Sequence, residues 1–337
     1  MIVQERVSLA LHTTLRVGGE ARYFVRVETP EDLREAVALA RTKNLPWYVL
    51  GEGSNVLAPD EGYEGVVIQM MILGCKIISQ EKDTLLVSGA GVSWEEVVHQ
   101  AAQAELWGIE NLAGIPGTVG AAPIQNIGAY GSEFAETLLW IEAYDAIHDC
   151  VVRLTKEECA FGYRDSVFKE RRELIVVQVA LSLAKYGQPN FSYKDLQTLV
   201  GQGVSLTTPK QVGDAVRSIR RKKFPDLRRE GTAGSFFKNP VISPSEYQEL
   251  VVRYPELPGF PQADGVKVPL AFILDAVLQL KGHAFKNARL FEAQPLVLVT
   301  THPSSEKEVE TLARDVEERV YKATHIRIQR EVRSVRA

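Results

Sequence analysis

A glycine-rich loop that follows an apolar segment is the part of this chain best suited to holding an anion. Leu45–Leu50 is predicted to be a strand and runs directly into this loop, whose residues are Gly51, Glu52, Gly53, Ser54 and Asn55. Bare backbone N–H groups in such a loop can close on a phosphate. A tight turn in a strand-rich protein accounts for the same residues equally well. The loop alone therefore leaves both interpretations open.

Neither G-x-G segment of the chain is the usual dinucleotide-binding fingerprint. After Gly51 and after Gly89, the third small position of the pattern is occupied by Val56 and Trp94. A bulky side chain at that position would hold a helix away from its strand. A dinucleotide, if bound, must therefore sit on a different scaffold.

A second segment, from Ile115 to Gly131, is long, uncharged and rich in small and amide side chains. These residues make a poor solvated loop, but they suit a backbone that lies against a flat, partly apolar ligand. We favour such a ligand wall over a plain turn. Its candidate contact residues are Ile115, Pro116, Gly117, Thr118, Gly120, Ala121, Gln125, Asn126, Gly128, Ala129, Tyr130 and Gly131.

Length and composition describe an ordinary globular enzyme. The chain has 337 residues, which exceeds the usual size of a domain built on a single hydrophobic core. Two or three domains are therefore expected. Hydrophobic residues make up 45% and charged residues 24%, and the net charge is -4. This charge argues against a dedicated nucleic-acid binder, although local basic patches could still hold phosphates.

Cysteine and histidine usage predicts no disulfide framework and no protein-ligated metal. Cys75, Cys150 and Cys159 are widely spaced, and the six histidines form no metal-binding motif. The N-terminal residues do not resemble a signal peptide. The most apolar run, Leu174 to Ala184, suits a buried strand and is too short to span a bilayer. We therefore expect a cytoplasmic protein with no membrane partner.

Capping signals predict where several helices begin. One helix is expected after a Thr29 cap, with Asp32 three residues later, and another over 94–105 behind a Ser93/Glu96 capping box. A third is expected from Thr208, with Gln211 in the box position, to the basic run that ends at Lys223, and others near Ser243, over 269–280 and over 305–322. Short strands dominate from about residue 65 to 185. A last strand, 325–333, places Ile326, Ile328 and Val332 on one face. The basic run Arg217, Arg220, Arg221, Lys222 and Lys223 is typical of a solvated helix end.

Further motifs occur in order along the chain: Phe161-Gly-Tyr-Arg-Asp-Ser, Ala233-Gly-Ser-Phe-Phe-Lys-Asn-Pro and Pro261-Gln-Ala-Asp-Gly. With the loops at Gly51 and Ile115, these motifs resemble the UDP-N-acetylenolpyruvoylglucosamine reductase family, flavoenzymes that complete UDP-N-acetylmuramate synthesis for peptidoglycan. The resemblance runs from about Thr13 to Arg333. It implies an α+β fold with a vanillyl-alcohol-oxidase (PCMH) type of FAD-binding architecture in two lobes, at 1–69 and 70–224. A separate α+β substrate-binding domain is implied at 225–324, with 325–337 returning to the active site.

The resemblance also implies ligands and residue roles. The Gly51 and Ile115 segments match FAD-binding stretches, and NADPH is the implied reductant. Ser235 matches the proton donor, and Arg164 with Glu331 matches the pair that stabilises the enol-like intermediate. Positions that match substrate contacts are Tyr193 in the mobile tyrosine loop of the family's first type, Lys223, Asn239, Lys281 and Gln294. Phe260 departs from the tyrosine often found there, which puts one hydroxyl contact in doubt but leaves a ring that could stack on uracil.

The chemistry of these side chains suits such a reaction, but each has a plainer interpretation. Adding hydride to an enolpyruvyl double bond leaves negative charge beside a carboxylate, which an Arg fork and a protonated, buried Glu could stabilise. A serine could then donate the proton if nearby cations, Lys238 or Lys223, assist. Against this, strand pattern alone favours a solvated ladder of Glu331 with Arg327, Gln329 and Arg333. Ser235 beside Gly234 could be an ordinary turn residue.

Two alternatives stay open at this point. One is an FAD oxidase or dehydrogenase acting on a sugar or alcohol, although the histidine that often tethers FAD in such enzymes is absent from both loops. The other is a non-catalytic nucleotide-binding module, or a nucleic-acid binder using residues 217–229. The leading expectation is a monomer whose partners are a UDP-linked enolpyruvyl sugar and NADPH.

Overall fold

The N-terminal part of the chain folds into a four-stranded sheet, whose strands in spatial order are β1 (Ile2–Ser8), β2 (Glu20–Val27), β5 (Tyr63–Met70) and β3 (Trp47–Leu50). The computed structural model describes residues 1–79 and 84–336. β2, β5 and β3 run parallel, and β1 runs antiparallel to β2. Helix α1 (Pro30–Thr42) begins at the predicted Thr29/Asp32 capping box and buries the stripe Leu33, Ala36, Val37 and Ala40.

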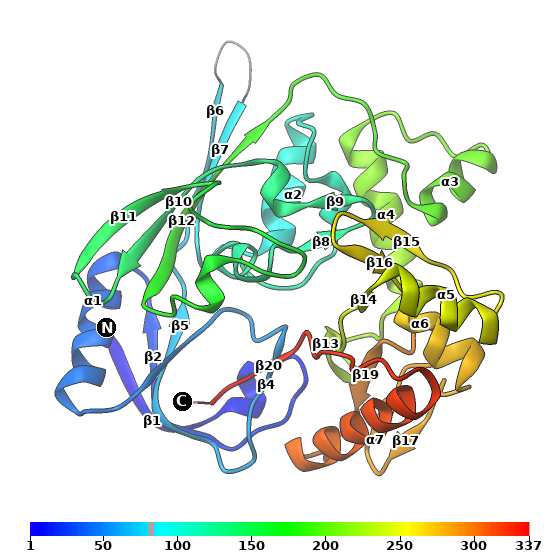
Figure 1. Cartoon of the computed structure of the whole chain (residues 1–337). Coiled ribbons are helices and arrows are strands. Elements are labelled where there is room, and N and C mark those ends of the chain that lie inside the picture. The colour runs from blue at the N-terminus through cyan, green and yellow to red at the C-terminus, as the bar shows by residue number, and fades with distance from the viewer. Residues whose placement is uncertain (80–83, 337) are drawn as a thin grey trace.

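A larger antiparallel sheet stands beside the first (Figure 1). Its strands in spatial order are β11 (Cys150–Thr155), β10 (Leu138–Asp145), β12 (Leu174–Leu183), β7 (Thr84–Gly89) and β6 (Cys75–Ser79). The apolar run at Leu174 is thus a buried strand, as predicted, and it lies at the centre of this sheet. Residues of both sheets, including Val25, Ile68, Leu86 and Val179, belong to one buried core. Burial on this shared core explains why β12 is apolar almost throughout.

Helices α2 (Trp94–Gln103) and α4 (Pro209–Lys223) pack against each other beside the larger sheet. The predicted capping box of α4 forms between Thr208 and Gln211. The box predicted at Ser93 is wrong, because the Ser93 side chain makes no capping hydrogen bond. Instead the backbone N–H of Trp94 donates to the Gly117 carbonyl at 2.8 Å. The Ile115–Gly131 segment therefore holds the start of α2.

The third part of the fold carries its own core. One sheet consists of β13 (Gly231–Ser235), β19 (Val297–Thr300), β18 (Ala288–Leu290) and β17 (Ala284–Phe285), and a smaller one of β14 (Val241–Ile242), β16 (Gly265–Lys267) and β15 (Phe260–Gln262). The helices are α5 (Pro244–Arg253), α6 (Leu270–Phe272), the π-helical turn η7 (Ile273–Val277) and α7 (Glu306–Thr324). Phe236 and Phe237 are buried in this core, which also takes in Leu15 from the N-terminal part. The domain limits expected at 69 and 224 stay a prediction.

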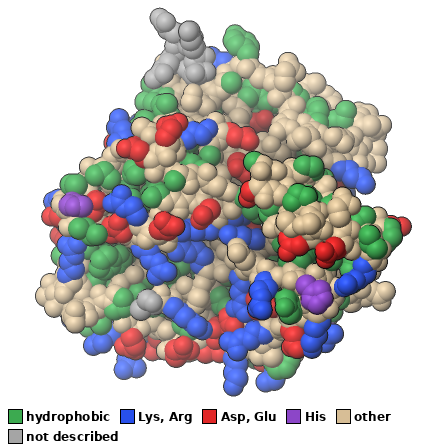
Figure 2. Space-filling model, in the orientation of Figure 1, with side chains coloured by type: hydrophobic (Ala, Val, Ile, Leu, Met, Phe, Trp, Pro, Cys, Tyr) green, Lys and Arg blue, Asp and Glu red, His purple; other side chains and the backbone are tan. Residues whose placement is uncertain are grey.

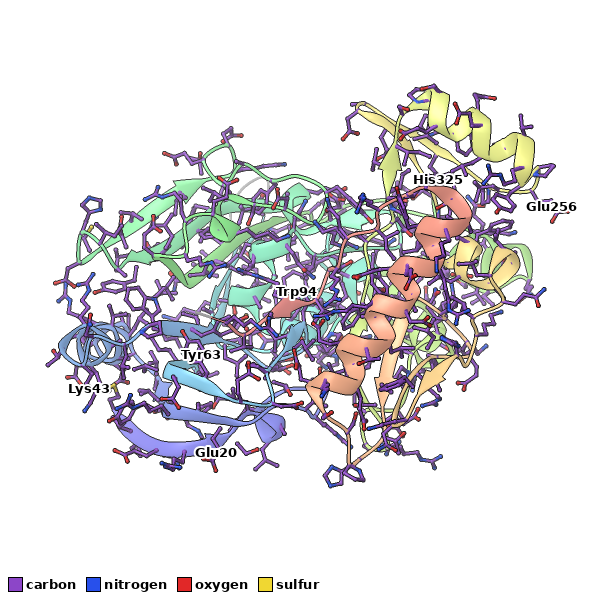
Figure 3. The ribbon with its side chains drawn as sticks, turned by 60° about the horizontal axis from the view of Figure 1, so that its bottom comes forward. Glu20, Lys43, Tyr63, Trp94, Glu256 and His325 are labelled. Carbon is purple, nitrogen blue, oxygen red and sulfur yellow. The ribbon has the colours of Figure 1, made fainter. Side chains whose placement is uncertain are left out.

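The C-terminal segment returns from the third part to the first. Helix α7 ends at His325, whose left-handed backbone (φ 59°) turns the chain back (Figure 3). The segment then crosses to the N-terminal part, where β20 (Arg333–Ser334) pairs with β4 (Val56–Leu57) (Figure 1). The continuous strand predicted over 325–333 is wrong, since the described ladder begins only at Arg333. The predicted alternation is nevertheless visible, because Ile326 and Val332 are buried.

Within the described ranges, no helix combines the length and apolar character needed to cross a membrane.

Candidate active site

A cavity of about 220 Å³ opens where the three parts of the fold meet. We call it the first cavity. Its lining comes from the Gly51 loop, the Ile115 segment, the strand end at Ser235 and the C-terminal segment at Glu331. Lys and Arg side chains gather across the middle of the molecular face in Figure 2, and Arg164, Arg220 and Arg333 line the cavity itself. Such a basic hollow suits an anionic ligand.

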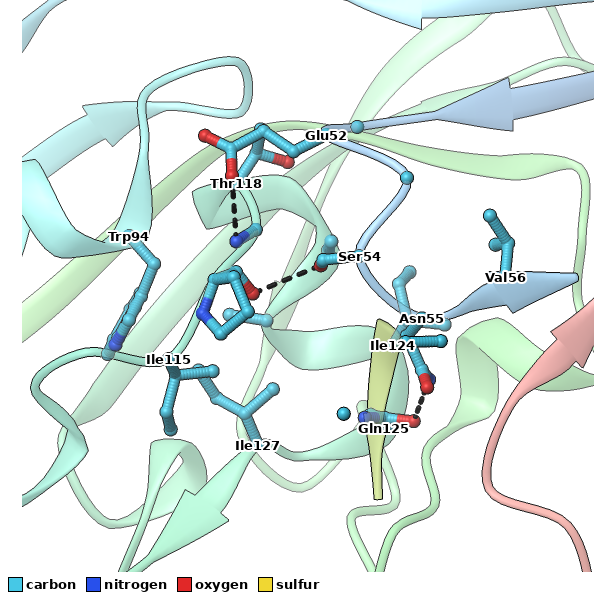
Figure 4. Close-up of a pocket in the computed structure, with 18 of the residues that line it drawn as sticks. Glu52, Ser54, Asn55, Val56, Trp94, Ile115, Thr118, Ile124, Gln125 and Ile127 are labelled. Atoms are coloured by element: carbon cyan, nitrogen blue, oxygen red, sulfur yellow. Dashed lines mark hydrogen bonds between the residues drawn. The ribbon is translucent and has the colours of Figure 1, made fainter. Parts of the chain in front are cut away.

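The two glycine-rich segments form one wall of this cavity (Figure 4). The Glu52 carboxylate accepts a hydrogen bond from the Gly117 N–H at 2.9 Å, and the Ser54 hydroxyl donates to the Pro116 carbonyl at 3.0 Å. The Asn55 amide donates to the Gln125 side-chain oxygen at 2.6 Å. Three side chains of this loop therefore fasten it to a segment far along the chain. The segments that sequence reasoning treated separately are one structure.

Glycine is required at two positions of this wall for steric reasons. A Cβ at Gly51 would lie 2.5 Å from the Thr118 hydroxyl oxygen, and one at Gly53 would lie 2.1 Å from the His12 carbonyl oxygen. Gly53 also has a positive φ of 67°, which favours glycine. The backbone at this corner is thus packed as closely as it can be. It leaves bare peptide groups along the cavity, the surface that a dinucleotide needs.

A second cavity, of about 780 Å³, adjoins the first and shares Tyr48, Gly51 and Thr118 with it. It lies between β3 and β12, because Trp47–Val49 and Leu174–Val176 line it. Its volume lies in the usual range for small-molecule sites. The first cavity, which reaches Ser235, is the smaller of the two, and the second lies between the two sheets. These residues fit an extended cofactor such as FAD.

Most of the predicted FAD residues line these cavities, and some do not. Gly120 lines only the second cavity, whereas Asn126, Ala129, Tyr130 and Gly131 line neither. The Asn126 side chain is used inside the protein, donating to Glu133 at 2.8 Å and accepting from the Ala135 N–H at 3.0 Å. The role of every one of the predicted residues in FAD binding stays a prediction.

Arg164 reaches the cavity from the tip of a very tight hairpin. Gly162 and Asp165 exchange backbone hydrogen bonds of 3.0 and 3.2 Å, so that Tyr163 and Arg164 are the two turn residues. Arg164 has a φ of 53°, a left-handed conformation that costs a residue with a Cβ about 1–2 kcal/mol. Its guanidinium donates to the Gly128 carbonyl at 2.6 Å and lies 3.2 Å from a Glu331 carboxylate oxygen.

Glu331 is brought to Arg164 by the C-terminal segment and is largely shielded from water. Its side chain is 14% exposed, so the solvated ladder favoured by the strand pattern is wrong for this residue. Its backbone N–H donates to the Phe236 carbonyl at 2.8 Å, and its carboxylate accepts from the Gln125 amide at 3.2 Å. Burial raises the pKa of Glu331, against the opposing effects of Arg164, Lys238 and Lys169. Glu331 therefore keeps its proton to higher pH than an exposed glutamate would.

Ser235 faces the same cavity from the end of β13. Its hydroxyl makes no hydrogen bond to any residue in the described ranges, and the two aromatic residues that follow it are buried. The hydroxyl is therefore available to a ligand. The structure thus brings Ser235, Arg164 and Glu331 to one cavity, as sequence reasoning expected of a reactive site.

The residues predicted to hold the substrate line neither cavity; several already have protein partners. Lys223 forms an ion pair with Asp195, and its ammonium lies 5.6 Å from the centroid of the Tyr193 ring. Lys281 pairs with Asp275 at 2.6 Å. The Asn239 side-chain oxygen accepts from the Leu270 N–H at 3.0 Å. Phe260 is 53% exposed, and the buried side-chain oxygen of Gln294 has no hydrogen-bond partner within the part of the chain described.

Arg220 is a site residue that sequence reasoning missed. The prediction of a solvated helix end is correct for Arg221 and Lys222, which are exposed, and wrong for Arg220, which lines the first cavity. Arg220 donates to the Gly114 carbonyl at 2.9 Å, and burial lowers its pKa. The signal was present, because Arg220 follows the buried Val212 and Val216 at four-residue spacing and so shares their helix face.

Known proteins match the chain along its whole length. Residues 21–149 match the FAD binding domain family, and residues 226–335 match the C-terminal domain family of UDP-N-acetylenolpyruvoylglucosamine reductase. The chain is 39% identical to the Shewanella sediminis enzyme named UDP-N-acetylenolpyruvoylglucosamine reductase, over 95% of this chain and 92% of that protein. It is 38% identical to the enzyme of that name from Escherichia coli K12, over 98% and 96% of the two chains.

A solved structure agrees. The Thermus caldophilus UDP-N-acetylenolpyruvylglucosamine reductase superposes with a TM-score of 0.69 at 27% identity, over 99% of each chain. The fold and the cavity wall thus define an FAD-dependent oxidoreductase with the FAD-binding architecture expected from the sequence. Within that class, the chain belongs to the UDP-N-acetylenolpyruvoylglucosamine reductase family. The sugar or alcohol oxidase alternative is not favoured.

Gly53→Ala is expected to weaken FAD binding by at least about tenfold, since a loss of about 1.4 kcal/mol suffices and the new Cβ cannot be accommodated without moving the loop. The visible absorbance of the purified protein per polypeptide, followed by titration of the apoprotein with FAD, measures the effect. Gly74→Ala is the matched control, because Gly74 also has a positive φ but a Cβ there meets nothing within 4 Å. Equal FAD affinity in the two variants would contradict the role of the Gly51 loop.

Proposed function

We propose that this chain uses FAD and NADPH to reduce the enolpyruvyl ether of UDP-N-acetylglucosamine-enolpyruvate to UDP-N-acetylmuramate, a step of peptidoglycan precursor synthesis. One observation carries the proposal. A free serine hydroxyl, an arginine and a buried glutamate face one cavity, beside a wall built from the FAD-binding segments. Membership of the reductase family supports the same substrate.

The Gly51 loop and the Ile115 segment would hold FAD, which would supply hydride drawn from the nicotinamide nucleotide. The protein must then stabilise the negative charge that develops beside the substrate carboxylate. The Arg164 guanidinium is suited to this task, because its planar fork matches a carboxylate and its direction is set by the Gly128 carbonyl. Glu331 acts in its protonated form, donating a hydrogen bond to the enolate oxygen.

Ser235 completes the reaction by giving its hydroxyl proton to the carbanion carbon. A serine is a weak acid, so this transfer needs a positive field around the forming alkoxide. Lys238 is the better of the two lysines considered, since Lys223 is already paired with Asp195. The charge of Lys238 acts on Glu331, whose pKa it lowers against the larger, opposite effect of burial.

The remaining parts of the proposal concern partners. The UDP-sugar is bound by Tyr193, Lys223, Asn239, Phe260, Lys281 and Gln294. NADPH and the UDP-sugar reach the first cavity in turn. The unpartnered oxygen of Gln294 supports a ligand contact there. The protein acts as a cytoplasmic monomer without nucleic-acid or membrane partners, which its net charge of -4 supports.

An absorption spectrum and an anaerobic titration test the proposal directly. The purified protein is expected to be yellow, to lose its visible absorbance when NADPH is added, and to regain it when UDP-N-acetylglucosamine-enolpyruvate follows. Formation of UDP-N-acetylmuramate checks the product. A colourless protein, or one that makes peroxide rapidly from a simple sugar and leaves the enolpyruvyl nucleotide unchanged, would contradict it.

Ser235→Ala is expected to lower turnover by on the order of 10²–10⁴-fold, the range for a lost general acid. Bleaching of the visible absorbance by NADPH should proceed at a near-normal rate, because the hydroxyl takes no part in that half-reaction. Stopped-flow measurement of each half-reaction separates the two. Ser235→Cys keeps a proton donor and should recover part of the loss. Collapse of both half-reactions in Ser235→Ala would mean that the serine is not the acid.

Glu331→Gln is expected to remove the fall of turnover at high pH that is due to this residue. Glu331 has a raised pKa, so its hydrogen-bond donor is present at low pH and is lost as the pH rises through that pKa. Glutamine cannot ionise and keeps an N–H donor, so turnover should drop by about tenfold but stay level at high pH. The pH profile of kcat measures this, with Glu256→Gln, an exposed residue far from the cavity, as control (Figure 3). An unchanged high-pH limb would rule out Glu331 as the donor.

A further inference from the structure

The backbone conformation of Arg164 needs support from its surroundings. Arg164 occupies the second turn position of a two-residue hairpin with a φ of 53°, where glycine or asparagine is the usual residue. Strained residues of this kind persist only where neighbouring contacts over-determine them. The guanidinium is held by Gly128 and Glu331. In the peptide group that follows Arg164, the Asp165 N–H donates to the Gly162 carbonyl at 3.2 Å, and the carbonyl oxygen of Arg164 takes a separate partner.

The partner of that carbonyl oxygen is Lys169. The Lys169 ammonium donates a hydrogen bond to the backbone carbonyl oxygen of Arg164. Lys169 ends the short 3₁₀ helix η6 (Val167–Lys169), which is itself anchored. Phe168 is buried, and the Ser166 hydroxyl donates to the Ile124 carbonyl at 2.8 Å. The lysine thus ties the turn to a segment that packs against the cavity wall.

The charge around Lys169 makes this hydrogen bond more than a surface contact. The Lys169 side chain is 20% exposed, and burial lowers its pKa, helped by Lys238 and Arg333 and opposed by Asp165 and Glu331. Its nearest carboxylate, on Asp165, lies 3.7 Å away and is 61% exposed. An exposed ion pair at that distance contributes little. The carbonyl of Arg164 is therefore the partner that orders the ammonium.

We propose that Lys169 is a positioning residue for the reductase reaction: it locks the strained turn that aims the Arg164 guanidinium at Glu331 and at the substrate carboxylate. This inference rests on the proposed function. It adds a residue whose side chain need not touch substrate or cofactor. Its effect should pass entirely through Arg164.

Lys169→Met tests the proposal, because methionine keeps an unbranched side chain of nearly the same length and removes the donor. The rate at which the enolpyruvyl substrate restores the visible absorbance of the reduced protein should fall by about 10–100-fold, as for other residues that orient a reactive group. UDP-N-acetylmuramate should also bind more weakly to the oxidised protein. The change that it produces in the visible spectrum measures this affinity. Lys169→Arg should recover most of both losses.

Asp165→Asn is the matched control, because it removes the ion pair of Lys169 and leaves the Arg164 carbonyl bond in place. Its kcat should stay within about twofold of the wild type. A loss equal to that of Lys169→Met would overturn the proposal. The melting temperature and FAD content of each variant are measured beside its activity. If Lys169→Met does not hold FAD, Lys169→Ala, which also removes the donor, is judged by the same criteria.

A double-mutant cycle separates positioning from a general loss of structure. In an Arg164→Gln background, Lys169→Met should cause no further loss of rate or of product affinity, since the group it positions is gone. Independent, additive losses would overturn the proposal, as would wild-type behaviour of Lys169→Met alone. Wild-type protein that cannot reduce the enolpyruvyl nucleotide would instead refute the proposed function, so the two failures are distinguishable.

Discussion

The contact between Arg164 and Glu331 is the constraint on which the rest of this site depends, because its two partners are far apart in the sequence. Glu331 reaches Arg164 only if the segment after α7 crosses from the third part of the fold to the first. That crossing is secured along its length. The backbone N–H of Lys238 donates to the Gln329 carbonyl at 2.8 Å, and the backbone N–H of Arg333 donates to the Asn55 carbonyl at 3.1 Å. Asn55 also donates to the Glu331 carbonyl at 3.3 Å and to Gln125. Asn55 therefore links the cavity wall to the backbone of Glu331.

The electrostatics of this contact follow from competition between burial and charge. Arg164, Lys238 and Lys169 all favour the ionised form of Glu331, yet burial prevails and the pKa of Glu331 is raised. Removing water costs a carboxylate more than these cations return, which leaves part of their positive field unneutralised. An anionic sugar nucleotide entering the first cavity would supply the missing negative charge. The same arrangement thus raises the pKa of Glu331 and favours the binding of an anionic substrate.

Local signals in the sequence were sufficient for elements whose stability is local. The capping boxes at Thr29 and Thr208 formed as predicted, and the apolar run at Leu174 became the central strand of a sheet. Signals failed where tertiary contacts decided the outcome. The Ser93 capping box does not form, and the Trp94 N–H donates to the Gly117 carbonyl instead. The C-terminal segment forms its two-residue strand only at Arg333. The burial of Glu331 could not be predicted either, since an alternating strand pattern shows which residues share a face but not what covers that face.

The candidate reactive site is one of several places where the chain departs from the local rules of backbone conformation. Asn126, Tyr130 and Arg164 all have positive φ angles, of 44°, 49° and 53°, and all lie in the cavity wall or against it. Two of these are side chains for which this conformation is unfavourable, so propensity alone would have placed glycine there. Each is held by contacts from elsewhere, Asn126 by Glu133, Tyr130 by Asn111 and Arg164 by Lys169. The strain is therefore carried by the surrounding fold. A loop able to relax would give up the fixed direction of the guanidinium, which is what a charge-stabilising group must keep before the substrate arrives.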